Sequence, residues 1–143
     1  MFNLYFDGWD VRPKFKTEYI TLWPTCLGKD NYHMFDEVTE EEWSRFNSLM
    51  KFVSKDYKIG LADCGAGEVT FPKEVEATFS NYKDSMNKDA SLFSQYILPE
   101  LECVISEDWD YTYILWHKDN GAVQALIPYI SKANLKHFSV ERS

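Results

Sequence analysis

The clearest periodic pattern of apolar residues predicts a helix that begins after Thr39 and ends near Lys55. Its apolar side chains recur at steps of three and four residues and so share one helical face: Trp43, Phe46, Met50 and Val53. Thr39 and Glu42 have the spacing of a capping box, in which each side chain bonds the backbone of the other residue. Acidic residues fill the first turn, where the helix dipole stabilises negative charge. The sequence therefore predicts both the start and the buried face of this helix.

A second run with helical spacing follows Pro72 and continues to Pro99. Its apolar members keep one helical phase: Val75, Phe79, Tyr82, Met86, Ala90, Phe93 and Ile97. Serine, asparagine and aspartate are frequent between residues 80 and 91, and their side chains compete for backbone hydrogen bonds. Residues 73–98 are therefore expected to form two helices, or one helix that bends near Asn87.

Short runs of branched and aromatic residues predict strands in the first half of the chain. These strands are expected over residues 2–6, 19–23 and 57–62. Gly8 follows the first run, and Pro24 ends the second because proline cannot donate to a strand ladder. Residues 24–37 have no clear period and are expected to form a loop.

The last third of the chain is predicted to be a β-meander. Its strands are expected over residues 102–106, 111–117 and 122–127. Asn120-Gly121 is a strong signal for a two-residue hairpin between the last two of them. Both faces of residues 111–116 are largely apolar, which is typical of a central strand. A short helix after Pro128 is expected to carry Leu135 and Phe138.

These elements indicate the α+β class, with an antiparallel sheet and a C-terminal β-meander packed against two to three helices. A chain of 143 residues fits one globular domain, residues 1–143. Hydrophobic residues make up 45% and aromatic residues 17% of the chain, which excludes a disordered protein.

The charge balance narrows the range of partners. The chain has 23 acidic and 15 basic residues, which gives a formal net charge of −8. Phosphate backbones and anionic membranes attract basic surfaces, so direct binding to nucleic acid or to a membrane is not expected. A basic protein partner is the sharper expectation, and solubility alone is the simpler explanation. The oligomeric state stays open.

The cysteines and the N-terminal residues indicate a cytoplasmic protein. Cys26, Cys64 and Cys103 are odd in number and do not have the spacing of a disulfide framework, so a reducing compartment is expected. The first residues lack the basic region and apolar run of a secretory signal. No stretch approaches the roughly 18 apolar residues that a membrane span needs.

The candidate catalytic motifs favour neither an enzyme nor a cofactor. Gly65-x-Gly67 suggests a dinucleotide loop, but Thr70 stands where the third glycine belongs and Glu68 would repel a phosphate, so a turn is expected. The sequence places no histidine beside Cys64, and the three histidines lack the spacing of a zinc site. Asp110 lies between two aromatic residues but is more simply a turn acid. An enzyme with a site near Cys64 or Asp110 is kept as the less favoured alternative.

Two acid-rich stretches give the most informative functional signal. Residues 98–111 contain five acids and no base, and residues 29–42 contain six acids and one lysine. Trp109 is predicted to lie at the tip between two strands, where an aromatic side chain ringed by carboxylates has the composition of an interface hot spot. The alternative is that Trp109 folds back onto the core. The predicted partner-binding residues are Glu107, Asp108, Trp109, Asp110, Asp36, Glu37, Glu40 and Glu41.

In physical character the chain resembles the immunity proteins of bacterial toxin systems. The resemblance is carried by the acidic-aromatic run from Glu107 to Tyr111 and by the acidic run from Asp36 to Glu42, in a small, cysteine-poor α+β protein. It implies an inhibitor that covers the active site of a basic nuclease toxin with acids and aromatic residues. The second hypothesis is a nucleic-acid mimic that antagonises a DNA- or RNA-binding defence enzyme, which requires the two acidic stretches to lie side by side.

Overall fold

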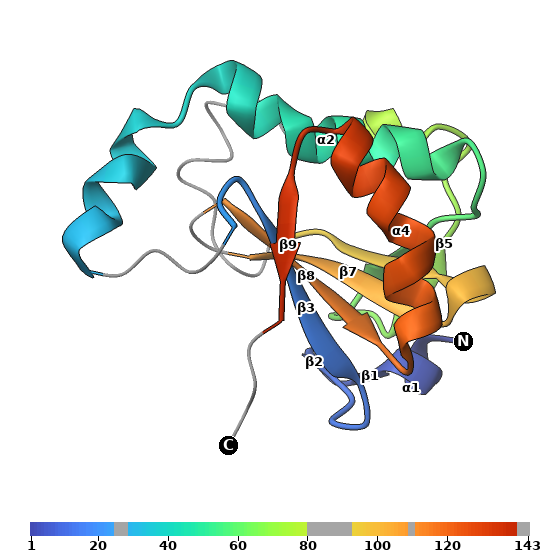
Figure 1. Ribbon diagram of the computed structural model, residues 1–143. Coiled ribbons are helices and arrows are strands. Elements are labelled where there is room, and N and C mark those ends of the chain that lie inside the picture. Colours follow the sequence, from blue (N-terminus) through green and yellow to red (C-terminus); the bar gives the residue numbers. More distant parts are fainter. Residues whose placement is uncertain (25–28, 80–92, 109–110, 140–143) are drawn as a thin grey trace.

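Seven antiparallel strands form the main sheet within the residues that the computed structural model describes, which are 1–24, 29–79, 93–108 and 111–139 (Figure 1). The strand order is β5-β4-β6-β7-β8-β3-β9, so the consecutive strands β6, β7 and β8 form a meander at the centre. The strand bounds are Lys16–Thr21 for β3, Gly60–Asp63 for β4, Glu68–Thr70 for β5, Gln95–Leu98 for β6, Cys103–Asp108 for β7, Thr112–His117 for β8 and Lys136–Phe138 for β9. The predicted α+β class, with an antiparallel sheet and a meander in the C-terminal half, is confirmed.

The two best-predicted strands are the neighbours β7 and β8. The structure places β7 and β8 within two residues of the predicted ranges 102–106 and 111–117. As expected from its two apolar faces, β8 is an inner strand, and all of its residues pair with both β7 and β3. The strands predicted over residues 19–23 and 57–62 are present as β3 and β4 but are shifted by about three residues.

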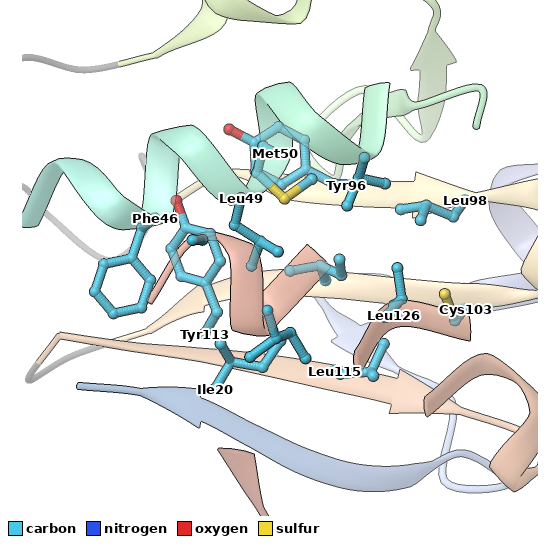
Figure 2. Close-up of a cluster of buried hydrophobic side chains, with 14 of the residues drawn as sticks. Ile20, Phe46, Leu49, Met50, Tyr96, Leu98, Cys103, Tyr113, Leu115 and Leu126 are labelled. Carbon is cyan, nitrogen blue, oxygen red and sulfur yellow. The ribbon is translucent and has the colours of Figure 1, made fainter. Parts of the chain in front are cut away.

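Helices α2 (Glu40–Ser54) and α4 (Asn120–Lys132) cover one face of the sheet (Figure 1). Phe46, Leu49 and Met50 of α2 point into the core, as Figure 2 shows. They pack in one cluster with Ile20, Tyr96, Leu98, Cys103, Tyr113, Leu115 and Leu126. Burying each large apolar side chain of this kind contributes about 1.5–3 kcal/mol, and more of the buried apolar side chains lie in this cluster than in the one on the opposite face.

The start of α2 is built as its sequence predicts. The backbone N–H of Glu42 donates to Thr39 Oγ1 at 3.1 Å, and the backbone N–H of Thr39 donates to Glu42 Oε1 at 3.1 Å. This reciprocal capping box satisfies two backbone donors that a helix N-terminus otherwise leaves unpaired. It also fixes where the preceding acidic segment joins the helix.

The N-terminal residues cover the opposite face of the sheet and correct the strand predicted over residues 2–6. They form a helical turn, α1 (Phe2–Tyr5), followed by the short paired strands β1 (Phe6–Asp7) and β2 (Asp10–Val11). Phe2, Tyr5 and Phe6 have helical spacing, so one face of the turn can bury all three rings. They pack in one cluster with Phe15, Ile97 and Val104.

The predicted strand over residues 122–127 and its Asn120-Gly121 hairpin are wrong, because this segment is the helix α4. Asp119 caps that helix, and its Oδ1 accepts a hydrogen bond from the Gly121 N–H at 2.7 Å. The buried side chains of α4 fall at helical steps and face the core: Ala122, Val123, Leu126 and Ile130. Capping by Asp119, one residue before the supposed turn, therefore outweighs the hairpin signal.

The helix predicted after Pro128 is also wrong, since the chain there ends α4 and then forms the edge strand β9. Pro128 lies inside α4, and Asn134 adopts a left-handed conformation with φ 59° just after the helix. The Leu135 N–H then donates to the Ile130 carbonyl at 3.0 Å, which closes the helix end. Phe138 pairs with Tyr19 of β3, and their rings stack at 5.6 Å.

The helical prediction for residues 73–98 fails at both described ends. Only a short 3-10 helix, η2 (Val75–Thr78), is present at the start, and residues 95–98 form β6, which pairs with β4 and β7. The predicted bend near Asn87 lies outside the described residues. The expected loop over residues 24–37 contains the 3-10 helix η1 (Lys29–Glu37), and η4 (Pro99–Leu101) follows β6. None of the described helices is long and apolar enough to cross a membrane.

Candidate functional site

The first acidic stretch lies on η1 and the first turn of α2, and Figure 1 shows η1 standing away from the sheet. Asp36, Glu37, Glu40 and Glu41 are all exposed. Four of the predicted partner-binding residues therefore lie within one short segment of the surface. We call η1 together with the first turn of α2, Lys29 to Glu42, the acidic arm.

The glutamates of the acidic arm differ in how their charge is balanced. Glu41 makes a bidentate pair with Arg45, with Nε to Oε1 at 3.3 Å and Nη2 to Oε2 at 3.0 Å. Arg45 Nη1 also donates to the Asn134 carbonyl at 3.3 Å, which ties α2 to the end of α4. Within the part of the chain that the structure describes, Asp36 and Glu37 make no salt bridge. Asp30 and Glu40 share this property, so four exposed carboxylates of the acidic arm have no ionic partner among the described residues.

The acidic arm also carries an exposed aromatic side chain, which the sequence pattern did not single out. Tyr32 is 54% exposed and lies 5.9 Å from the half-buried Phe35 ring. Phe35 in turn meets the Trp23 ring edge-on at 5.3 Å, which anchors η1 to the segment after β3. Tyr32 is thus an exposed aromatic residue that packs on Phe35, with acidic residues before and after it in the chain.

The second acidic stretch is arranged differently from the prediction. Glu107 and Asp108 end β7 and are half-buried, while Trp109 and Asp110 lie outside the described residues. Glu107 Oε1 accepts a hydrogen bond from the Ser94 N–H at 2.9 Å, and the Glu107 N–H donates to the Ser94 carbonyl at 2.9 Å. Because successive residues of a strand face opposite sides of the sheet, Glu107 and Asp108 do not share one surface.

The surroundings of Glu107 are those of the core side of the sheet. Its cross-strand partner is Tyr113, which is 8% exposed and packs on Phe46 at 4.9 Å. Burial, followed by the neighbouring Tyr96 and Glu107, raises the pKa of Tyr113 well above its ordinary value. Glu107 therefore helps to hold β6 against β7 and faces the helix-covered side of the sheet.

A further acidic-aromatic cluster, which the sequence analysis missed, forms where two hairpins meet. Trp9 is 60% exposed at the turn between β1 and β2, and Asp7 and Asp10 are directly paired on either side of it. Its Cζ2 lies 3.6 Å from the position that a Cβ on Gly65 would occupy, so the ring lies over the turn between β4 and β5. That turn is bounded by the cross-strand pair Asp63 and Glu68. The run Asp7-Gly8-Trp9-Asp10 shares with residues 107–110 a tryptophan that is followed by an aspartate and preceded within two residues by an acid, and was the available signal.

The environment of Cys64 disfavours its use as a nucleophile. Burial, followed by the charges of Asp63 and Asp10, raises the pKa of the Cys64 thiol, whereas a reactive cysteine needs a lowered pKa. His117 Nδ1 lies 3.0 Å from the Asp119 carbonyl, and His137 Nδ1 lies 2.9 Å from Glu18 Oε1. These two imidazoles therefore have partners away from Cys64.

The glycine-rich stretch after β4 is a hairpin turn, as expected. The Gly67 N–H donates to the Asp63 carbonyl at 2.8 Å, and the Ala66 N–H donates to Asp63 Oδ1 at 3.0 Å. Gly67 has φ 69°, a conformation that disfavours other residues. Over the described residues, no group of three or more histidine, cysteine or acidic side chains is placed to hold a metal ion.

Comparisons of the chain with protein-family models, with curated proteins and with solved structures gave no match. Its function is therefore inferred from the charges and exposed side chains of the molecule itself. The acidic arm carries the most of these features, because four predicted binding residues and one exposed tyrosine lie together on it.

Proposed function

We propose that this protein is a small cytoplasmic inhibitor of the immunity type, which neutralises a basic protein partner such as a bacterial nuclease toxin. The observation that supports the proposal is the acidic arm, where exposed carboxylates and the 54% exposed Tyr32 stand away from the sheet. An exposed aromatic ring supplies contact area at little entropic cost, and the surrounding charges guide the partner into place. This combination fits protein binding better than catalysis.

The net charge of −8 favours a basic partner over its alternatives. Charged groups steer association over about one Debye length, roughly 8 Å at physiological salt, so the charges near the contact matter most. Asp36 and Glu37 lie in that position in the proposed complex. A nucleic-acid mimic would need a row of carboxylates spaced like phosphates, and the contact of Glu107 with the Ser94 backbone does not favour one.

The first experiment is affinity capture from a lysate of the source organism, with and without nuclease treatment. We expect one basic protein at near-equal stoichiometry, released by salt and indifferent to nuclease. The captured partner is then expressed alone and its association and dissociation rates with the protein are measured. Competition between the protein and DNA for the same target separates the mimic from the inhibitor only in part, because an inhibitor that covers a nuclease active site also competes with DNA. Failure to bind any basic protein would contradict the proposed function.

The site is tested with a double charge reversal, Asp36→Lys with Glu37→Lys. We expect the association rate at low salt to fall about tenfold or more, because steering depends on rim charges. Glu74→Lys with Glu76→Lys changes the net charge equally on other exposed residues, and serves as the matched control. Equal effects of the two pairs would contradict the site.

The role of Tyr32 is tested separately, because an aromatic anchor acts mainly on dissociation. Tyr32→Ala is expected to raise Kd by roughly 30-fold, which corresponds to about 2 kcal/mol. Its high exposure means that the substitution leaves the fold intact. An unchanged dissociation rate would remove Tyr32 from the interface.

A further inference from the structure

A cavity of about 460 Å³ lies between the segment that joins α2 to β4 and the segment that joins β5 to η2. Ile59 and Val75 line it and are 6% and 5% exposed, so they belong to the core and form an apolar floor. Phe71 and Pro72 add further apolar lining. Ligand sites commonly have volumes of about 300–1,000 Å³, and this cavity lies in that range, with a lining that is about equally polar and apolar.

The aromatic wall of the cavity is held in place from two sides. Lys58 Nζ lies 4.4 Å from the centroid of the Phe71 ring, within the range of a cation–π contact. A Cβ on Gly60 would lie 3.0 Å from Phe71 Cε1, so glycine allows the ring to pack closely on that strand. The Lys58 N–H donates to Glu100 Oε1 at 2.7 Å, which fixes the backbone of the lysine. An ammonium group therefore lies over the Phe71 ring in the wall of the cavity.

The charged residues that line the cavity are balanced in sign. Lys58 and Lys73 are positive, while Glu74 and Glu76 are negative. Among the described residues none of these four makes a salt bridge with another side chain. A purely anionic ligand would meet two carboxylates there, and a purely cationic ligand would meet two ammonium groups. A ligand that carries one charge of each sign can satisfy both sets.

We propose that this cavity binds a small zwitterion with an apolar side chain, namely a free amino acid with an aromatic or large aliphatic side chain. The carboxylate pairs with the lysines, the ammonium group pairs with the glutamates, and the side chain covers Ile59 and Val75. This site does not depend on the proposed inhibitor function, because it lies on other residues and binds its ligand without a protein partner.

The test is a titration of the isolated protein with L-phenylalanine, followed by backbone amide chemical shifts. We expect saturable shifts concentrated at residues 54–59 and 71–76. Removing one ligand charge, in 3-phenylpropionate or in phenethylamine, should weaken binding by roughly three- to tenfold, since each charge loses its partners on the rim. Absence of shifts at millimolar ligand, shifts centred on other residues, or equal binding of either analogue would overturn the proposal.

Substitution of an exposed rim residue provides a second test that does not endanger the fold. Lys73→Met should weaken L-phenylalanine binding by roughly three- to tenfold, while Lys51→Met, an exposed lysine of α2 outside the cavity, should leave it unchanged. Binding that survives Lys73→Met at full strength, or that Lys51→Met weakens equally, would also overturn the proposal.

Discussion

Substitutions at Asp119 and Gly121 test whether residues 120–132 form a capped helix, α4, as the structure shows. Gly121 is helical, and its N–H is held by Asp119 Oδ1 at 2.7 Å. A Cβ added at Gly121 would lie 2.8 Å from that same oxygen, so the aspartate side chain would have to move. Gly121→Ala therefore improves helix propensity and disturbs the helix cap in a single change.

The two effects are similar in size and opposite in sign. Alanine in place of a helical glycine stabilises by up to about 1 kcal/mol, while loss of an aspartate cap costs about 0.5–2 kcal/mol, typically about 1. Gly121→Ala should thus change the free energy of unfolding by less than about 0.5 kcal/mol in the natural sequence. In an Asp119→Ala background the cap is already lost, and the same change should stabilise by about 1 kcal/mol.

The assay is urea unfolding of the natural protein, the two single variants and the double variant, followed by far-UV circular dichroism. Asp119→Ala alone should lower the free energy of unfolding by about 1 kcal/mol. The coupling energy of the cycle should then be about 1 kcal/mol and favourable to the double variant. The four proteins should share one m-value, so that differences in their unfolding midpoints reflect differences in stability alone.

A hairpin turn at Asn120-Gly121 would give a different result. Glycine in such a turn adopts positive φ, so alanine would destabilise by about 1 kcal/mol or more whatever residue stands at Asp119. Destabilisation of similar size in both backgrounds, with no coupling, would refute the reasoning about α4.

Three further predictions concern the core and two titrating side chains. Leu49→Ala, at a core position that is 1% exposed, should lower the free energy of unfolding by about 3–5 kcal/mol and the Tm by roughly 6–20 °C in calorimetry; a loss below about 1 kcal/mol would contradict the packing of α2. Burial raises the pKa of Cys103 to about 12, so peptide-resolved alkylation near neutral pH should modify the half-buried Cys64 long before Cys103; equal rates would contradict the burial of Cys103. Tyr129 donates a hydrogen bond to Asp56 Oδ2 at 2.6 Å, which raises the pKa of Tyr129 from 10.0 to about 12. The contribution of this hydrogen bond to stability is therefore complete below pH 10 and is lost as the pH rises to about 12. Asp56→Asn should return this pKa towards 10.0 in a phenolate absorbance titration compared with the natural protein, and an unchanged curve would exclude the pairing.

Elements with strong local signals could be predicted from the sequence. The capping box of Thr39 and Glu42 involves residues only three apart, so its geometry is encoded within one turn of chain. Strands β7 and β8 are dense in branched and aromatic residues, and such strands suit a position between two neighbours. In both cases the local preference and the tertiary environment agree.

The predictions failed at segments whose sequence pattern is compatible with two different secondary structures. Asn120-Gly121 suits a hairpin turn and equally suits the first turn of a helix capped by Asp119, and the choice depends on core contacts of Ala122 and Leu126. Ile97 happens to continue the helical phase of Phe93, but it belongs to three consecutive apolar residues, Tyr96 to Leu98, that are buried because β6 has neighbours on both sides. Pairing partners distant in the sequence decide such segments.

The sequence could predict where acidic residues of the candidate site lie along the chain, but not which of them are exposed. The acids between Asp36 and Glu41 are exposed in the structure, whereas Glu107 faces the core side because it pairs with Tyr113 across the sheet. Exposure of the single aromatic residues Tyr32 and Trp9 depends on how η1 and the N-terminal hairpin sit on the rest of the molecule. No periodic pattern in the sequence predicts the exposure of these single aromatic residues.

The carboxylates of the acidic arm also differ in what a partner would gain from them. Glu42 is used by the helix cap, Glu41 by the bidentate pair with an arginine, and Glu40 lies where the helix dipole already stabilises negative charge. Asp36 and Glu37 precede the cap and receive none of this balance from the described residues. A basic group docking there replaces only water at those two carboxylates, without breaking an existing ion pair. The largest electrostatic gain on binding is therefore expected at Asp36 and Glu37, even though the acidic run is longest at the start of α2.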